Sequence, residues 1–188
     1  MIRSKSLFLA AFFVLLATML PARDAHPLKT VDSVDLQRYA GDWYEIARYP
    51  NRSQRDCDSD VHVRYMLQGS GKISVRNECR KANGKPDIAN GIAKVVDAKS
   101  NAKLKVTFFW PFYADYWIID LDPRYRYAVV GEPGRKYLWI LSRSKELDQE
   151  SYRHILQRVA ENGYDPSKLV KTKQSLATAE LVSPALLP

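Results

Sequence analysis

The chain has 188 residues, which suits one domain with a sizeable buried core. Its formal net charge is +8, with lysines and arginines scattered along the chain instead of massed in one block. We interpret them as a solvated surface, and no nucleic-acid-binding module is recognisable.

The first 25 residues have the pattern of a secretory signal peptide. A short basic segment, Met1–Ser6, precedes an almost unbroken apolar run, Leu7–Leu20, and small residues follow at Ala22 and Ala25. The run is short for a membrane span, although a retained anchor is the alternative. We therefore expect export and cleavage after Ala22 or Ala25, which leaves a net charge of +6 once residues 1–25 are removed.

Export determines how the two cysteines, Cys57 and Cys79, are interpreted. In an oxidising compartment an even pair predicts one disulfide, which here closes a loop of 22 residues. No cysteine follows closely on the apolar run, so we expect no lipid-modified cysteine there and a soluble mature protein.

Eight strands are predicted from alternating apolar and polar residues and from the turn residues between them. In the first of them, Trp43, Glu45 and Ala47 share one face, because side chains alternate along a strand. The predicted strands cover residues 43–49, 61–68, 73–79, 89–97, 103–108, 116–121, 125–130 and 137–143.

The period changes only after the last of these strands. Apolar residues between Tyr152 and Ala160 recur at helical spacing, which predicts one amphipathic helix. Asp148 is its expected N-cap, and Gly163 is placed where a C-terminal cap belongs. Residues 168–173 are expected to add a short strand. The predicted domain is 26–174, followed by a flexible tail, 175–188.

This order of elements predicts an all-β fold, an eight-stranded up-and-down antiparallel calyx barrel with the helix packed outside. A two-sheet sandwich is the alternative. Loop lengths favour the barrel, because the turns at one end are tight and the loops at the other are longer. Gly41, Trp43 and Arg143 fall at the tight end, where we expect Arg143 to stack on the Trp43 indole and close the floor. Cys57 and Cys79 both fall at the open end.

Three blocks in this order resemble the signature blocks of the lipocalins: Gly41–Tyr49, Tyr116–Asp122 and Tyr137–Arg143. The segments Leu104–Tyr113 and Asn162–Lys168 are similar to bacterial envelope lipocalins related to apolipoprotein D. The resemblance covers about residues 31–174 and implies a calyx that holds a lipid. Two features depart from these relatives: many carry an anchor cysteine that is missing here, and the second block continues as Leu121-Asp122-Pro123. We therefore expect a free periplasmic protein. An association with the outer membrane, if there is one, does not use a lipid-anchor cysteine.

A barrel of eight strands is just wide enough for one small ligand, or its side chains simply fill it. The inner face is predicted to be mostly apolar with a few polar groups, as ligand pockets are. The expected ligand-binding residues are Glu45, Ala47, Val63, Tyr65, Asn77, Phe108, Trp117, Ile119, Tyr137 and Trp139. In the family, the tryptophan of the third block can stack on ligand, which favours Trp139.

Basic residues on the long loops are candidates for contact with an anionic head group, although loop solubility explains them as well. They are Arg52, Arg55, Arg135 and Lys136. Aromatic residues at 110, 112 and 113 are expected either to touch a membrane surface transiently or to form a lid.

No catalytic motif is present, and the three histidines are dispersed, so we expect neither a cofactor nor a metal site. Glu45, facing an apolar interior, is expected to be a hydrogen-bonded structural carboxylate in preference to a catalytic acid. The leading hypothesis is non-catalytic binding and transport or storage of a fatty acid or lysophospholipid in envelope maintenance. The alternatives are another apolar ligand, such as a retinoid, a sterol-like compound or haem, and a lipid-modifying enzyme. The oligomeric state stays open.

Overall fold

The computed structural model describes residues 26–175, so the predicted signal peptide and nearly all of the predicted tail lie outside the described residues. Its elements agree with the predicted order. They are α1 (Leu36–Tyr39), β1 (Gly41–Arg48), η1 (Arg52–Gln54), β2 (Ser59–Gln68), η2 (Gly69–Gly71), β3 (Lys72–Arg80), β4 (Pro86–Val95), β5 (Lys103–Phe109), β6 (Phe112–Leu121), β7 (Tyr127–Gly131), β8 (Leu138–Ser142), α2 (Gln149–Glu161), η3 (Pro166–Lys168) and β9 (Val170–Lys171).

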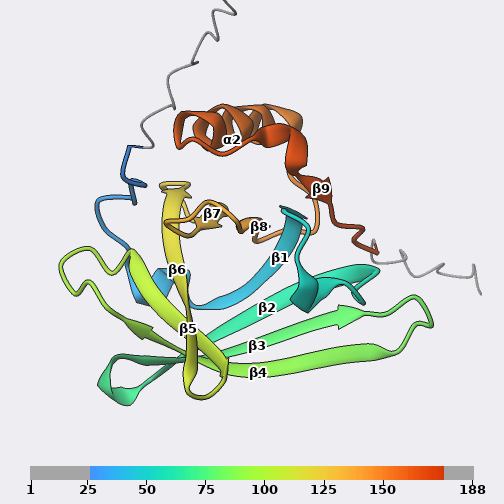
Figure 1. The fold of residues 1–188 in the computed structure, drawn as a ribbon, viewed down its shortest axis with the longest axis horizontal. Coiled ribbons are helices and arrows are strands. Elements are labelled where there is room, and N and C mark those ends of the chain that lie inside the picture. Colours follow the sequence, from blue (N-terminus) through green and yellow to red (C-terminus); the bar gives the residue numbers. More distant parts are fainter. Residues whose placement is uncertain (1–25, 176–188) are drawn as a thin grey trace, which may run out of the picture.

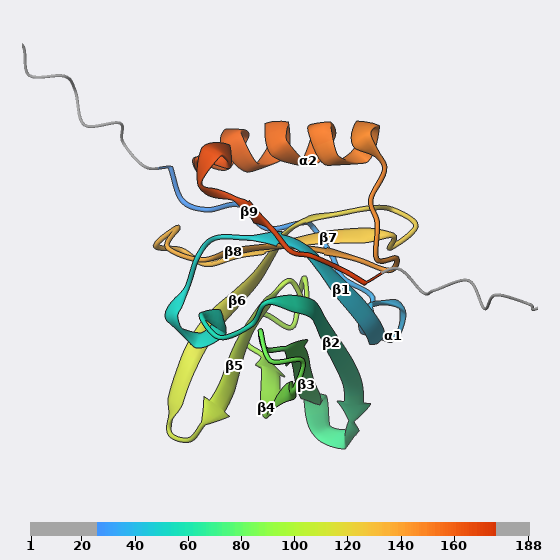
Figure 2. The same ribbon diagram turned by 90° about the vertical axis from the view of Figure 1, so that its right-hand side faces the viewer.

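Each strand pairs antiparallel with the next, from β1 through β8, and β1 also pairs with β8. The sheet therefore closes on itself, which confirms the predicted barrel and excludes the sandwich (Figure 1). Figure 2 shows β1, β2, β3, β4, β5 and β6 arranged around a ring, with α2 outside it.

Strand β1 divides one edge between two partners. Its first half, Gly41–Tyr44, pairs with β2, and its second half, at Ala47 and Arg48, pairs with β9. Beyond β9 the chain continues beside β2, where Asp60 donates its backbone N–H to the Lys173 carbonyl oxygen. We call residues 170–175 the seam segment, because it fills the gap where β1 and β2 separate.

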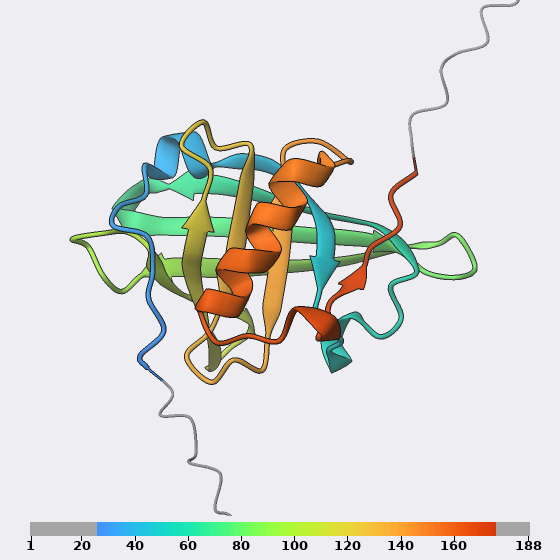
Figure 3. The ribbon, with the colours of Figure 1, turned by 90° about the horizontal axis from the view of Figure 1, so that it is seen from above.

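The barrel has two apolar cores, one on each side of the sheet. The inner core contains Trp43, Val63, Ile118 and Leu141, all of them buried. The outer core lies beneath α2, where Ile155 and Val159 pack on strand residues such as Ile140. Figure 3 shows α2 lying across β7 and β8. Strands in this half of the barrel are thus covered on both faces.

The helix begins and ends where its capping residues predict. The Asp148 carboxylate accepts the Ser151 backbone N–H at 2.8 Å, which satisfies one of the free donors of the first turn. Gly163 follows the C-cap residue with φ +79°, a conformation that favours glycine.

The tight end is sealed by the contact predicted between two distant strands. The Arg143 guanidinium carbon lies 3.9 Å from the Trp43 ring centroid. Arg143 also donates to the carbonyl oxygens of Asp42, at 2.8 Å, and Tyr39, at 3.2 Å. Gly41, beside this arginine, has φ +94°, a backbone conformation that favours glycine.

At the opposite, open end, Cys57 and Cys79 form the predicted disulfide, with 5.6 Å between their Cα atoms. This bond ties the loop before β2 to the end of β3. The loops between strands at this end surround the mouth of the barrel.

Candidate ligand-binding site at the open half of the barrel

The inner surface changes character from the closed end to the open end. Val63 and Tyr65 are buried in the inner core. Asn77, directly opposite Val63 on β3, is only partly buried, and Ala89, the next inner position across on β4, is exposed. Along β4 the inner positions pass from buried Ala93 near the closed end to exposed Ala89 near the open end, so the inner wall reaches solvent in its open half.

Phe108 lies on this open half of the inner wall. Its ring covers Gly91, because a Cβ at Gly91 would lie 2.8 Å from Phe108 Cδ1. Gly91 pairs with Val75 of the inner core, so its missing side chain makes room for the phenyl ring on the inner face. Phe108 keeps 44% of its surface exposed.

Trp139 faces the same interior from β8. Its indole packs against the inner core and stacks on Tyr137, with ring centroids 5.9 Å apart and planes at 9°. The Trp139 Nε1–H donates to Gln54 Oε1 at 2.9 Å. Tyr137 is 45% exposed, so this stacked pair forms part of the open inner surface.

Glu45 is a buried carboxylate, and both of its oxygens accept hydrogen bonds. Its Oε1 accepts from Arg48 Nη1 at 2.8 Å and from the Thr172 hydroxyl, and its Oε2 accepts from Gln54 Nε2 at 2.7 Å. Thr172 belongs to the seam segment. Glu45 is thus hydrogen-bonded to other side chains, as expected of a structural carboxylate inside the barrel.

The prediction that Ala47 lines the interior is wrong. A β-bulge in the pairing of β1 with β8, between Glu45 and Ala47, shifts the alternation by one residue. Ala47 therefore packs in the outer core beneath α2. The same shift turns Arg48 inward, opposite Trp139, a position that simple alternation from Trp43 missed.

Trp117 and Ile119 were also assigned to the wrong face. Ile119 is buried in the outer core, and Trp117 packs partly against that core. The inner positions of β6 are Tyr116 and Ile118. The alternation could not reveal this, because residues 116–119 of β6 are all apolar or aromatic and pack in the inner and outer cores in turn.

Tyr65, a predicted inner residue, meets two tyrosines that were not among the predicted site residues, Tyr39 and Tyr116, deep in the barrel. The hydroxyl of Tyr116 lies 2.6 Å from that of Tyr39 and 2.8 Å from that of Tyr65. Burial raises the pKa of all three phenols, so they remain protonated hydrogen-bonding groups in an apolar floor.

The predicted rim cations differ in whether other groups of the protein already bind their side chains. Arg135 donates to the carbonyl oxygens of Asn162 and His26, at 2.8 and 2.6 Å, and thus fastens the end of α2. Arg55 lies 3.6 Å from the Asp56 carboxylate. Arg52 and Lys136 are exposed.

The hairpin between β5 and β6 carries exposed aromatic side chains, and we call Phe109, Trp110, Phe112 and Tyr113 the aromatic tip. Their exposed fractions are 76%, 78%, 72% and 40%. Phe109 and Phe112 stack across the hairpin with ring planes at 6°, and Lys94 lies 4.5 Å from the Tyr113 ring centroid. Phe112 and Tyr113, predicted in a loop, belong to β6.

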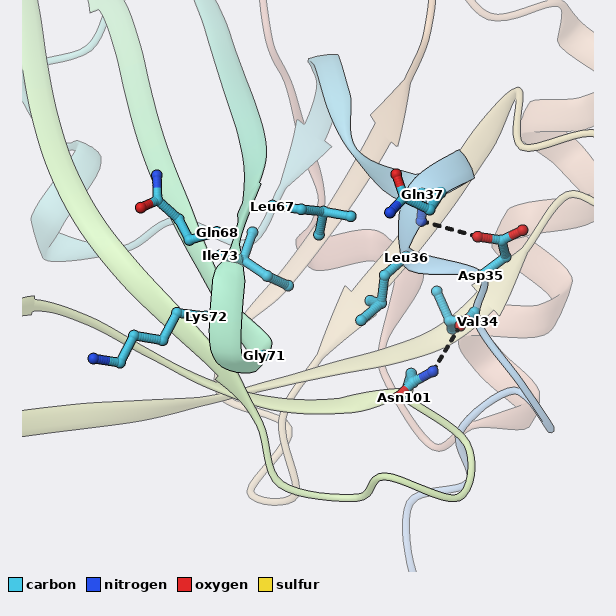
Figure 4. Close-up of a pocket in the computed structure, with 10 residues that line it drawn as sticks. All are labelled: Val34, Asp35, Leu36, Gln37, Leu67, Gln68, Gly71, Lys72, Ile73 and Asn101. Atoms are coloured by element: carbon cyan, nitrogen blue, oxygen red, sulfur yellow. Dashed lines mark hydrogen bonds between the residues drawn. The ribbon is translucent and has the colours of Figure 1, made fainter.

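A separate pocket of about 360 Å³ lies at the closed end, between the α1 segment and the turn that joins β2 to β3 (Figure 4). Its apolar wall is formed by Leu36, Leu67, Ile73 and Val34 of the inner core or packed against it. Its remaining lining residues are polar or glycine, and Figure 4 shows the Lys72 ammonium pointing away from the apolar wall.

The described part of the chain shows neither a group of metal-ligating side chains nor a free thiol. Between residues 26 and 175, no three His, Cys, Asp or Glu side chains are grouped so that they could hold a metal ion. Both cysteines of the chain are in the disulfide. No helix within these residues is long and apolar enough to cross a bilayer.

The fold and the inner wall agree with a known family of proteins. The model of the lipocalin-like domain matches residues 34–174. The chain belongs to the lipocalin family. Temperature-induced lipocalin-1 of Arabidopsis thaliana is 42% identical over 156 residues, which cover 79% of this lipocalin and 83% of the relative. The outer membrane lipoprotein Blc of Escherichia coli K12 is 39% identical over 145 residues, covering 77% and 81%.

Solved structures agree on the fold of this lipocalin. Insecticyanin of Manduca sexta superposes with a TM-score of 0.65 at 23% identity, over 81% of this chain and 86% of the insecticyanin chain. Membership of the family makes this lipocalin a binder of small hydrophobic ligands.

Proposed function

We propose that this lipocalin binds and carries, without catalysis, a single-chain acyl lipid, a fatty acid or lysophospholipid. The observation that supports this most is the apolar inner wall that remains exposed at the open end, around Phe108, Tyr137 and Trp139. Burying an acyl chain there gains about 0.8 kcal/mol per methylene, which is enough for micromolar affinity after ordering costs. Export to the bacterial periplasm and a role in envelope maintenance are part of this proposal, in line with the relatives named outer membrane lipoprotein.

The first test is ligand binding by the delipidated protein. We expect palmitate and a lysophospholipid to quench Trp139 fluorescence with dissociation constants of about 1 μM or below. A panel with retinol, a sterol and haem separates the alternative ligands. Protein from the native host that carries no acyl lipid, and binds none when titrated, would overturn the proposal.

A matched pair of variants locates the site. Phe108→Asp and Ile92→Asp each place a carboxylate at a position with similar exposure, 44% and 40%. Phe108 lies on the inner wall, whereas Ile92 adjoins inner-core Ala93 in β4 and faces outward. Phe108→Asp should weaken acyl binding by about tenfold or more, because a charge then faces the chain. Ile92→Asp should leave binding unchanged.

The aromatic tip supports a second part of the proposal, transient contact with a lipid bilayer during ligand exchange. Aromatic side chains are favoured at the boundary between water and hydrocarbon. Four of them project together from one hairpin on strands that also wall the barrel, with Lys94 beside Tyr113. A lid over the mouth would instead bury these rings.

Removing two of these rings should reduce binding to vesicles. We expect Trp110→Ala/Phe112→Ala to bind phosphatidylglycerol-containing vesicles about tenfold less tightly in sedimentation, with unchanged affinity for free palmitate. Met66→Ala serves as the control, since Met66 is 46% exposed on β2. Equal sedimentation of the variant and the parent would exclude the contact.

A further inference from the structure

Arg48 is a cation inside the barrel, placed there by the bulge in β1. It lies directly opposite Trp139, and its side chain is only 13% exposed. An arginine at this depth needs partners for its donors, because burial of an unsatisfied polar group is costly. The hydrogen bonds of Arg48 therefore show which of its donors the protein satisfies and which are left for a ligand.

Among residues 26–175, hydrogen bonds engage only the Nη1 end of the Arg48 guanidinium. Nη1 donates to Glu45 Oε1, at 2.8 Å, and to the Thr172 hydroxyl, at 3.2 Å. Nε is buried without a hydrogen-bond partner among residues 26–175, and Nη2 makes no hydrogen bond there. Nε and Nη2 form the edge of arginine that pairs side-on with a carboxylate or phosphate through two parallel hydrogen bonds.

Glu45 does not require that edge. Its two oxygens already accept from Arg48 Nη1, Thr172 and Gln54, and its carboxylate holds the guanidinium in a fixed orientation. Preorganised in this way, Arg48 loses little conformational entropy when it binds an anion. The neighbouring Trp139 and Tyr137 rings provide an apolar wall beside it.

We propose that the free Nε/Nη2 edge of Arg48 binds the anionic head of the ligand, a carboxylate or a phosphate, inside the barrel and not at the loop rim. The natural ligand is then an ionised amphiphile, and neutral lipids of the same chain length bind less well. This inference rests on the proposed function and specifies its ligand. It also moves the head-group site away from Arg135, whose donors fasten α2, and Arg55, which lies beside Asp56.

The test compares ligands that differ only in the head. Hexadecanoate and 1-hexadecanol are titrated in parallel at pH 8, with a lysophosphatidic acid of the same chain length to separate phosphate from carboxylate. We expect the parent protein to prefer an acid over the alcohol by about tenfold or more, the effect of a bidentate charge-assisted pair. In Glu45→Gln/Arg48→Met both charges are removed together, so no buried charge is left unpaired. This variant should lose the preference while binding the alcohol as the parent does.

Two further variants test whether the preference for acids depends on the Arg48 side chain or on cations at the rim. Arg48→Lys retains the charge but not the two-donor edge, so we expect it to lose most of the preference for acids over the alcohol. This variant still tests the inference if Glu45→Gln/Arg48→Met does not fold. Arg52→Gln/Lys136→Gln removes exposed rim cations and should keep the preference. A preference for acids that survives in the Arg48 variants would overturn the inference, as would equal binding of acid and alcohol by the parent. Failure of the parent to bind any of these ligands would instead overturn the proposed function.

Discussion

Replacing Trp43 with alanine is expected to lower the free energy of unfolding by about 3–5 kcal/mol, the cost of deleting a buried indole. Trp43 is fully buried, and its ring centroid lies 5.0 Å from that of Tyr39. Its Nε1–H donates to the Tyr39 carbonyl oxygen at 2.8 Å, and Arg143 covers its face. The variant therefore loses inner-core packing, a hydrogen bond and the stacked cation at once. Urea unfolding followed by far-ultraviolet circular dichroism measures the change.

Trp110→Ala is the matched control, because Trp110 is 78% exposed. We expect it to change the free energy of unfolding by no more than about 0.5 kcal/mol. A double-mutant cycle with Arg143→Met should return a coupling of about 1–2 kcal/mol between Arg143 and Trp43. Near-equal stability of the two tryptophan variants would show that the closed end does not hold the barrel together.

Removal of the disulfide is expected to have the next largest effect. Cys57→Ala/Cys79→Ala should lower the free energy of unfolding by about 3 kcal/mol, because the unfolded chain gains the freedom of an open loop. That loop has a sequence separation of 22 residues and joins β3 to the segment before β2. Urea unfolding with and without dithiothreitol measures this difference.

The reductant supplies an internal control. It should destabilise the parent protein by about as much as the two substitutions do, and it should leave the double variant unaffected. Ligand affinity should change little, since the disulfide joins the segment before β2 to β3, whereas Arg48, Phe108 and Trp139 lie on β1, β5 and β8. A parent protein that unfolds at the same urea concentration in both redox states would contradict this account.

The sequence was sufficient for the closed barrel because several independent patterns agreed. Alternation is clear where only one face of a strand is covered, as in β2 and β3, and it placed Val63, Tyr65 and Asn77 on the inner face. Loop lengths placed Trp43 and Arg143 at one end and Cys57 and Cys79 at the other, in agreement with the stacking and the disulfide predicted from the residue types. Their agreement fixed which end is open.

Two kinds of site residue could not be predicted in the same way. The face of Ala47 depends on a bulge, and a bulge adds one residue without an unambiguous sequence mark. Trp117 and Ile119 lie in a stretch with apolar residues on both faces, and the bulge between Ile118 and Asp120 makes the nearest polar residue an unreliable guide to the outer face. Thr172, which completes the Glu45 bonds, comes from a segment 127 residues away, and only the three-dimensional structure brings it there.

The seam segment has a consequence for biosynthesis. The β1 edge at Ala47 and Arg48 is paired only by residues 170 and 171, and the Gln174 amide then bridges the carbonyl oxygens of Glu45 and Val61. These partners are among the last residues of the domain to be synthesised. Until they emerge from the ribosome, the β1 edge at Ala47 and Arg48 lacks these hydrogen-bonding partners and can pair with other chains. The nascent domain therefore stays vulnerable to aggregation until its last residues have been translated.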